Sequence, residues 1–246
     1  QTCALPICQG ETEGVFQLES SGMKQVLVGL QPQNLEDVIA LISLYRPGPM
    51  DSIPTYLRNR HEPDKISYKT PQLAHILDVT NGCIVYQEQV MQIFRELAGF
   101  SFGQADNVRR AMSKKKHAVM EAEREHFVHG CTEPGHECPG CVANGISEEV
   151  ANEIYDEMSS FASYAFNKSH AACYAYVAFQ TAYLKCHYPS EVMAALLTSV
   201  LDNTEVKNIW KANGAKPGMV LYEVYTTVYV TPREKLPDEL KANAKK

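Results

Sequence analysis

The spacing of apolar residues from about residue 20 onward predicts a chain built almost entirely of helices. Apolar side chains recur every three to four residues in successive segments, which is the period of a helix buried on one face. The helix expected at residues 169–187 is apolar on most sides, so we expect it to be buried. The expected helices cover residues 20–30, 34–45, 71–77, 87–97, 101–112, 116–128, 147–161 and 169–187, and one more starts at Pro189. Residues 51–61 read as a further helix or an irregular segment.

Several helix limits follow from local chemistry. Asn34 can cap the helix that follows it, because a short side-chain oxygen can accept from a free backbone N–H of the first turn. The prolines of Arg46–Pro49 should stop that helix, since proline cannot continue a helix interior. Thr70 before Pro71 is a second expected start. Gly82–Tyr86 reads as an extended piece before the next helix.

The two ends of the chain depart from this pattern. Residues 1–10 show no helical or strand periodicity, and reverse translation of Gln1–Ile7 matches a widely used sequencing adapter. We interpret them as translated adapter, with an ordinary disordered terminus as the alternative. After Asn203, β-branched and aromatic residues bounded by Gly and Pro predict a short hairpin. The predicted fold is therefore all-α over residues 11–203, with a β-hairpin-like C-terminal appendage in residues 204–246.

Composition limits the functional classes. The 246 residues are 45% hydrophobic and 21% charged, as in an ordinary soluble globular protein, and the length allows one large or two small domains. No apolar run approaches the roughly eighteen residues needed to cross a bilayer, and the N-terminus lacks the order of a signal peptide. We expect a cytoplasmic protein.

A basic cluster stands out because the formal net charge of the chain is −6. Adjacent arginines on a helix diverge by about 100°, so one can reach a phosphate while the other pairs with a carboxylate such as Asp106. The alternative is a solvated basic face. The cluster, which indicates a polyphosphate or nucleic-acid ligand, consists of Arg109, Arg110, Lys114, Lys115 and Lys116.

A second group of polar residues lies at the N-terminus of the long apolar helix. Asn167, Lys168, Ser169 and His170 lie where unpaired backbone N–H groups and partial positive charge favour an anion. We expect Lys168 and His170 to contact a nucleotide, and a protonated His170 could act as general acid toward leaving pyrophosphate. The alternative is a plain helix cap with a satisfied core histidine.

A cysteine cluster suggests a metal. Cys131, His136, Cys138 and Cys141 have the ligand types of a structural zinc knuckle, within a loop at residues 131–145 that is rich in Gly and Pro. Four protein ligands would leave no open position for water, so such a zinc ion would not be catalytic. A reduced, metal-free surface loop is the alternative.

Five ordered motifs resemble the fingers region of the bacterial DNA polymerase III alpha subunit family, from about Glu11 to about Asn203. They are Gly14–Met23, Arg46–Pro49, Tyr86–Met91, the basic run from Asn107 and the Phe166–Ala172 segment. The resemblance implies template-directed nucleotidyl transfer with a DNA primer-template, a deoxynucleoside triphosphate (dNTP) and Mg²⁺ as reaction partners. It also implies a sliding clamp and other replisome subunits. Lys115 and Lys116 are candidate DNA contacts. Arg46 is a candidate DNA or nucleotide contact, with a structural turn as the equal alternative. Glu88 can be read as a catalytic base, but we expect it to be a buried support for the basic helix.

The resemblance also implies that the catalytic carboxylates are elsewhere. In this family they belong to a palm domain that precedes the fingers, and the chain contains no Asp-x-Asp pair. We therefore expect a fingers fragment that binds nucleotide or DNA but does not polymerise. The alternative is a stand-alone zinc-containing nucleic-acid-binding module. Residues 207–246 resemble the end of an NFACT-type RNA-binding domain, which suggests a chimeric join near Thr204–Asn208 or a divergent natural tail.

Overall fold

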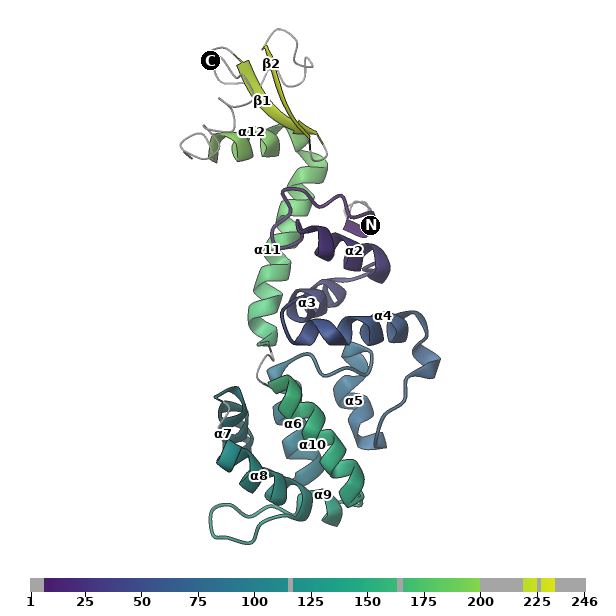
Figure 1. Cartoon of the computed structure of the whole chain (residues 1–246), viewed down its shortest axis with the longest axis vertical. Helices are drawn as coiled ribbons and strands as arrows, with labels where there is room; N and C mark the ends of the chain where they lie inside the picture. The colour runs from purple at the N-terminus through teal and green to yellow at the C-terminus, as the bar shows by residue number, and fades with distance from the viewer. Residues whose placement is uncertain (1–6, 115–116, 163–165, 200–218, 225–226, 233–246) are drawn as a thin grey trace. The chain divides into compact units, whose positions relative to one another are not determined.

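Helices dominate the part of the chain that the structure, a computed structural model, describes: residues 7–114, 117–162, 166–199, 219–224 and 227–232 (Figure 1). Most of the helices lie within the predicted spans, which confirms that the chain is mainly helical. The helix expected at residues 71–77 is instead a 3₁₀ turn followed by one α-helical turn, and a short helix at Gly140–Ala143 lies within the predicted cysteine loop. The α-helices are α2 (Ser21–Leu30), α3 (Leu35–Leu44), α4 (Ile53–His61), α5 (Ala74–Leu77), α6 (Gln87–Ala98), α7 (Phe102–Ser113), α8 (His117–His129), α9 (Gly140–Ala143), α10 (Glu148–Ala162), α11 (Lys168–His187) and α12 (Pro189–Ser199). Short 3₁₀ turns are η1 (Pro49–Ser52), η2 (Pro63–Lys65), η3 (Pro71–Leu73) and η4 (Asp78–Thr80).

The chain divides into two compact units. The larger unit is residues 25–176, and the smaller one combines residues 1–24 with residues 177–246. The predicted sequence segments 1–10, 11–203 and 204–246 concern the origin of the chain rather than its packing, and they stay predictions.

The core of the larger unit is centred on α6. Its Phe94 is fully buried, and its ring centroid lies 5.3 Å from that of Phe100, 5.0 Å from that of Phe127 and 5.9 Å from that of Tyr155. These residues come from α6, the segment after it, α8 and α10, so one aromatic cluster joins the elements that surround α6. Aromatic pairs in tilted and edge-to-face arrangements add to the free energy of burial. The start of α6 is therefore carried on a well-packed helix.

Helix ends in the larger unit follow the predicted chemistry. The Asn34 side chain accepts from the backbone N–H of Asp37 over 3.0 Å, as predicted for the cap of α3, and α3 ends at Leu44, just before the proline-containing turn. At the other end of α6, Gly99 has a φ of 73°, and a Cβ placed there would lie 2.5 Å from the ring of Pro139. Glycine is therefore required where α6 meets the loop before α9.

In the smaller unit the N-terminal segment lies along the second half of α11. The ammonium group of Lys185 donates to the backbone carbonyls of Glu11 (3.2 Å) and Glu13 (2.6 Å). The N–H of Phe16 donates to Oγ1 of Thr181 over 3.1 Å. The family-like motif that starts at Gly14 is thus held by contacts to a helix more than 160 residues later in the chain.

Two short strands complete the described part of the smaller unit. The strands β1 (Met219–Val224) and β2 (Thr227–Pro232) pair antiparallel, with Val224 opposite Thr227. The two residues between them lie outside the described residues. The hairpin-like appendage accordingly stays a prediction.

The expectation that the long helix is buried is wrong for one of its faces. On α11 the small residues Ala171, Ala175, Ala178 and Ala182 form the buried stripe. The aromatic residues point the other way, and Tyr176 and Phe179 remain 57% and 48% exposed. The sequence pattern misleads because alanine and tyrosine both count as apolar, although only the alanines allow close packing of the helix. Among the described residues, no helix is both long enough and apolar enough to cross a bilayer.

Candidate functional site

The start of α6 is joined to the segment before α11 by the backbone. Tyr86 and Phe166 form a parallel bridge in which the N–H of Gln87 donates to the carbonyl of Phe166 over 3.1 Å. Tyr86 itself is buried, with 2% of its surface exposed, so the bridge is fixed in the core of the larger unit. The extended piece predicted at Gly82–Tyr86 therefore brings the polar residues at the start of α11 to the beginning of α6.

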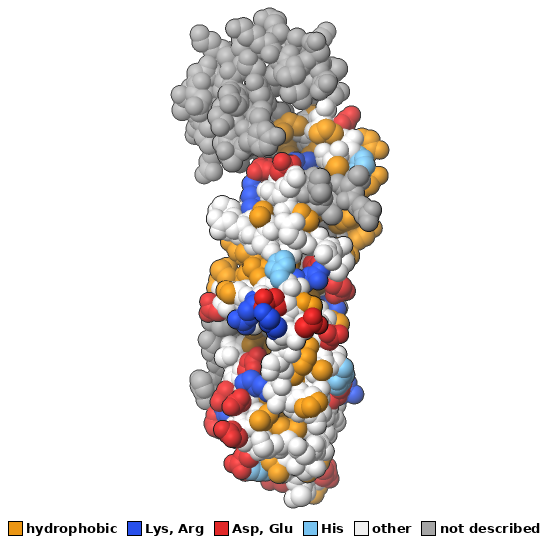
Figure 2. Space-filling view, turned by 90° about the vertical axis from the view of Figure 1, so that its right-hand side faces the viewer, with side chains coloured by type: hydrophobic (Ala, Val, Ile, Leu, Met, Phe, Trp, Pro, Cys, Tyr) orange, Lys and Arg blue, Asp and Glu red, His pale blue; other side chains and the backbone are white. Residues whose placement is uncertain are grey.

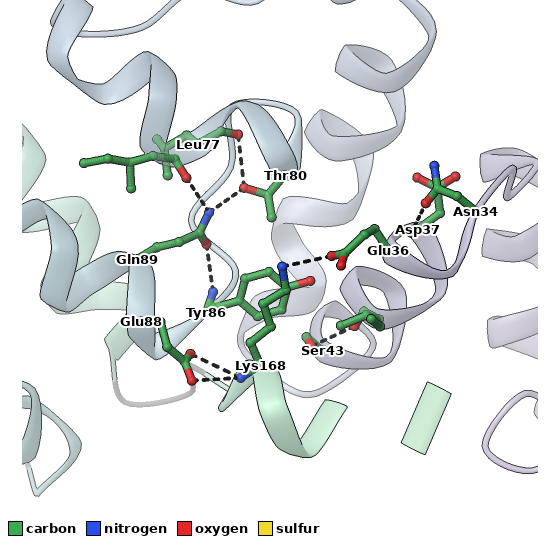
Figure 3. A network of polar contacts seen from close by, with 12 residues as sticks. Asn34, Glu36, Asp37, Ser43, Leu77, Thr80, Tyr86, Glu88, Gln89 and Lys168 are labelled. Carbon is green, nitrogen blue, oxygen red and sulfur yellow. Dashed lines mark hydrogen bonds and ion pairs between the residues drawn. The ribbon is translucent and has the colours of Figure 1, made fainter. Parts of the chain in front are cut away.

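The N-terminus of α11 is capped by a carboxylate from α6. The oxygens of Glu88 accept from the backbone N–H of Lys168 at 3.1 and 3.2 Å (Figure 3). They also accept from the Nδ2 of Asn167 at 2.8 Å. The Oδ1 of Asn167 accepts from the N–H of His170 over 3.0 Å, so Asn167 is the cap residue of the helix. A negative charge at this end is favoured by the helix dipole. The position predicted for a bound anion is thus occupied by the carboxylate of Glu88.

The side chain of Lys168 is paired as well. Its Nζ lies 2.9 Å from a carboxylate oxygen of Glu36 on α3 and 5.3 Å from the centroid of the Tyr86 ring (Figure 3). About a third of the lysine side chain remains exposed. The Lys168 ammonium is therefore held near the start of α6, with its charge balanced and partly open to solvent.

Arg109 on α7 reaches both its own helix and α6. Its Nη1 donates to Oε1 of Gln87 over 3.0 Å, and its Nε and Nη2 donate to Oδ1 of Asp106 at 3.0 and 2.8 Å. The Nε of Arg110 lies 2.8 Å from the other oxygen of Asp106. The expectation that only one of the two arginines pairs with the carboxylate is wrong, because Asp106 lies three and four residues before them and reaches both.

The two arginines change the acidity of Asp106. The hydrogen bond from Arg109, with the positive charges of Arg109 and Arg110, holds the pKa of the Asp106 carboxyl below its usual value. Asp106 is therefore ionised throughout the neutral range. It holds the guanidinium of Arg109 beside Gln87 at the start of α6.

One pocket of about 490 Å³ is bordered by residues of α6, of α7 and of the segment just before α11. It joins the two elements that the sequence suggested as separate phosphate sites, because both Arg109 and Asn167 line it. Met91 and Phe102 give it an apolar side, and the ring of Phe102 is 65% exposed. The remaining lining residues are polar or charged: Gln87, Glu88, Gln92, Arg95, Glu96 and Asp106.

The other predicted contact residues lie around this site or outside it. Ser169, His170 and Lys114 are exposed. The His170 ring packs between Phe166, at 5.2 Å between centroids, and Tyr174, at 4.3 Å. Arg46 is also exposed, and its guanidinium carbon lies 4.3 Å from the centroid of the Phe166 ring. The candidate DNA contacts Lys115 and Lys116 lie outside the described residues.

The predicted zinc ligands are not brought together. Cys131 and Cys138 face each other in an antiparallel bridge with two backbone hydrogen bonds of 2.9 Å, but Cys141 is fully buried in the core and His136 is exposed. Burial, together with the nearby Cys138, raises the pKa of the Cys141 thiol to about 12. No three potential ligands converge among the residues that the structure describes. The loop is instead closed by backbone bonds and apolar packing.

Sequence reasoning missed how the Tyr86–Gln89 motif works. Glu88 was expected to be buried, but it is exposed and caps α11 rather than supporting the basic helix. Gln87, which contacts Arg109, was not singled out at all. The available signal was the presence of three polar residues at one helix start. The partners of the first two, Gln87 and Glu88, lie 22 and 80 residues away in the chain.

Over the part of the chain that the structure describes, basic side chains are interspersed with acidic ones. Lysine and arginine side chains lie beside acidic ones over the face in Figure 2 rather than gathering in one area. In the larger unit the pairs Arg60–Asp37, Lys168–Glu36 and Arg124–Asp156 show the same arrangement. A ligand with several negative charges would therefore have to compete with carboxylates of the chain for the cations of these pairs.

A model of the bacterial DNA polymerase III alpha subunit finger domain matches residues 2–135. The chain belongs to this family. The match includes the basic helix α7 and the Tyr86–Gln89 motif, whereas the start of α11 lies beyond it. It begins inside the segment interpreted as adapter, so it gives that interpretation no support. Nothing in the comparisons supports an NFACT-like tail either.

Curated relatives extend the similarity beyond the matched region of the finger domain. A DNA polymerase III subunit alpha of Thermus aquaticus is 51% identical over 197 residues, which are 78% of this chain and 15% of that protein. A DNA polymerase III subunit alpha of Staphylococcus aureus is 46% identical over 195 residues, 79% of this chain and 17% of that protein. The chain thus spans about one sixth of the length of these relatives.

Proposed function

We propose that this finger domain binds the triphosphate of an incoming dNTP in a DNA polymerase that carries out template-directed nucleotidyl transfer. The observation that carries the proposal is the pocket bordered by both Arg109 and Asn167. A guanidinium and a carboxamide donor on one rim suit phosphate oxygens. The family and its alpha-subunit relatives support a replicative polymerase as the setting.

Each predicted residue has a role in this proposal. Arg109 would bind phosphate oxygens with its planar fork, and Lys168 and His170 would approach from the start of α11. Asn167 and Ser169 would donate neutral hydrogen bonds there, and Arg110 and Lys114 would add positive charge from α7. Arg46, Lys115 and Lys116 are proposed contacts to the DNA backbone. Exposure supports the roles of Arg46, Lys114, Ser169 and His170, whose side chains are open to solvent.

Binding would replace ion pairs within the chain by ion pairs to the ligand. Arg109 and Arg110 share Asp106, and Lys168 is paired with Glu36. A triphosphate carries more negative charge than one carboxylate, and exposed pairs are worth only about 0–1 kcal/mol each. Exchange of partners is therefore inexpensive, and the internal carboxylates keep the cations in place before the ligand arrives.

The residues of this pocket do not fit a magnesium site. Glu88 is engaged by the donors of Asn167 and Lys168, Asp106 by two arginines, and Glu96 by His75. No group of three carboxylate, histidine or cysteine ligands converges among the described residues. Magnesium in the intact polymerase would activate the attacking hydroxyl and stabilise the charge on the leaving pyrophosphate, and its ligands are proposed to belong to other parts of the enzyme.

The binding proposal is tested by titrating the isotope-labelled chain with a dNTP and following amide and arginine side-chain NMR signals. We expect saturable shifts at the start of α11 and at α7, with millimolar affinity, and a loss of at least about fivefold in affinity for Arg109→Ala. Lys65→Ala is the charge-matched control, since that lysine side chain is 74% exposed and lies outside the pocket. Equal affinities of the two variants would rule out Arg109 as a triphosphate ligand.

Wider roles follow from the relatives alone. We propose that the intact protein works on a DNA primer-template with a sliding clamp and other replisome subunits, in the cytoplasm. The alternative of a stand-alone zinc-containing nucleic-acid-binding module is favoured by no observation, because the four cysteine and histidine residues do not converge.

A further inference from the structure

Two consecutive side chains at the start of α6 reach the two walls of the pocket. The Oε1 of Gln87 accepts from Nη1 of Arg109 on α7. The carboxylate of Glu88 accepts from Asn167 and from the backbone N–H of Lys168 at the start of α11. Neighbouring residues on a helix point about 100° apart, so one short segment can hold two different elements.

The start of α6, which carries Gln87 and Glu88, is itself held by buried hydrogen bonds. The Oε1 of the next residue, Gln89, accepts from the backbone N–H groups of Val85 and Tyr86, both at 2.9 Å. The side chains of Tyr86 and Val90 are buried on either side of this turn. Buried neighbours therefore hold the Glu88 backbone in place. The exposed carboxylate of Glu88 in turn holds the first turn of α11 through its hydrogen bonds.

We infer that Glu88 is a positioning residue that orders the start of α11 for phosphate binding, a role that rests on the proposed function of the pocket. Its negative charge alone would repel a triphosphate. Its hydrogen bonds have the opposite effect, because they hold the Asn167 amide and the first turn of α11 in one place. Glu88 does not itself touch the ligand in this proposal, so it is not a catalytic residue.

Charge and position can be separated with two variants. Glu88→Gln removes the charge but keeps an acceptor oxygen for the Lys168 N–H, whereas Glu88→Ala removes both. If Glu88 positions α11, a dNTP should bind Glu88→Gln at least as tightly as the unmodified chain. The same dNTP should bind Glu88→Ala about fivefold or more weakly than Glu88→Gln. If Glu88 acts only by its charge, both variants should bind equally well and more tightly than the unmodified chain.

The experiment combines dNTP titration with amide hydrogen exchange on the whole 246-residue chain. The exchange protection of the Lys168 amide reports the Glu88 contact without any ligand, and we expect it to fall in Glu88→Ala and to be largely kept in Glu88→Gln. Glu149→Ala, an exposed acidic residue on α10, is the charge-matched control and should change neither readout.

The outcomes are distinguishable. Unchanged Lys168 protection in Glu88→Ala, or equal dNTP affinity of the two Glu88 variants, would overturn the inference. If the unmodified chain binds no dNTP while Glu88→Ala still loses Lys168 protection, the proposed function fails and Glu88 keeps only the ordering of α11. Loss of protection together with the predicted order of affinities supports both.

Discussion

The side-chain amide of Gln89 donates to Oγ1 of Thr80 over 2.7 Å, and both residues are buried in the larger unit (Figure 3). The same amide donates to the carbonyl of Ile76 over 3.0 Å, and its oxygen accepts from the N–H groups of Val85 and Tyr86. One glutamine thus satisfies four polar groups, one of α5 and three of the segment between α5 and α6. Buried polar groups that lose such a partner are expensive.

We expect Gln89→Ala to lower the free energy of unfolding by about 3 kcal/mol, because it leaves several buried donors and acceptors unpaired. Urea denaturation followed by circular dichroism measures this. Gln92→Ala is the matched control on the same helix, since Gln92 bonds only to the exposed Glu96, and it should change stability by less than about 0.5 kcal/mol. Equal effects of the two substitutions would show that the buried network contributes little.

Phe94 joins four structural elements, so its truncation should be severe. Phe94→Ala removes a fully buried ring that contacts Phe100, Phe127 and Tyr155, and we expect a loss of about 3–5 kcal/mol of unfolding free energy. Phe102→Ala removes a ring that is 65% exposed and should change stability by less than about 1 kcal/mol. The two variants are compared by thermal and urea unfolding. A mild Phe94→Ala would mean that the cavity closes by repacking.

Asp106 should make a small contribution to stability that disappears in acid. Its pKa is lowered in the folded chain by the Arg109 hydrogen bond and by the charges of Arg109 and Arg110. A lowered folded-state pKa stabilises the fold above the usual carboxyl value of 3.8, and the contribution is lost as the pH falls through the lower folded value. Pairs of this helical spacing give about 0.3–0.5 kcal/mol each.

The measurement is the difference in unfolding free energy between the unmodified chain and Asp106→Asn as a function of pH. We expect a difference of less than about 1 kcal/mol at pH 7, shrinking below about pH 4, and reduced by 1 M NaCl because the pairs are partly exposed. A difference that is constant with pH would show that Asp106 does not act through its charge.

The helices could be predicted from sequence because their signals are local. Asn34 caps α3 through a residue three positions away, and the apolar positions of α6 and α10 repeat at the helical period. The exposed side of α11 could not be predicted, because apolar spacing does not tell the buried alanines from the exposed Tyr176 and Phe179.

The candidate site was only partly predictable for a related reason. Arg109 and Asn167 were recognisable as residue types that suit phosphate, but their meeting in one pocket depends on the Tyr86–Phe166 bridge between residues 80 positions apart. The zinc hypothesis relied on spacing alone. Spacing cannot reveal that Cys141 packs into the core while His136 faces solvent.

The cysteines should differ sharply in reactivity. Burial raises the pKa of the Cys83 thiol to about 11, and burial with the nearby Cys138 raises that of Cys141 to about 12. Since the thiolate is the reactive form, both should resist iodoacetamide at pH 8, whereas the exposed Cys173 and Cys186 should be alkylated. Peptide mass spectrometry before and after denaturation measures this, with the denatured chain as the control for intrinsic reactivity.

The same labelling experiment decides between a metal-free and a zinc-bound cysteine loop. In a metal-free loop closed by the Cys131–Cys138 backbone bonds, prior treatment with a chelator should leave the protection of Cys141 and the unfolding midpoint unchanged. A structural zinc ion contributes directly to folding free energy, so its removal would lower the midpoint and expose the thiols together. Chelator-dependent alkylation of Cys131, Cys138 and Cys141 would therefore contradict the packing described for this loop and restore the zinc hypothesis.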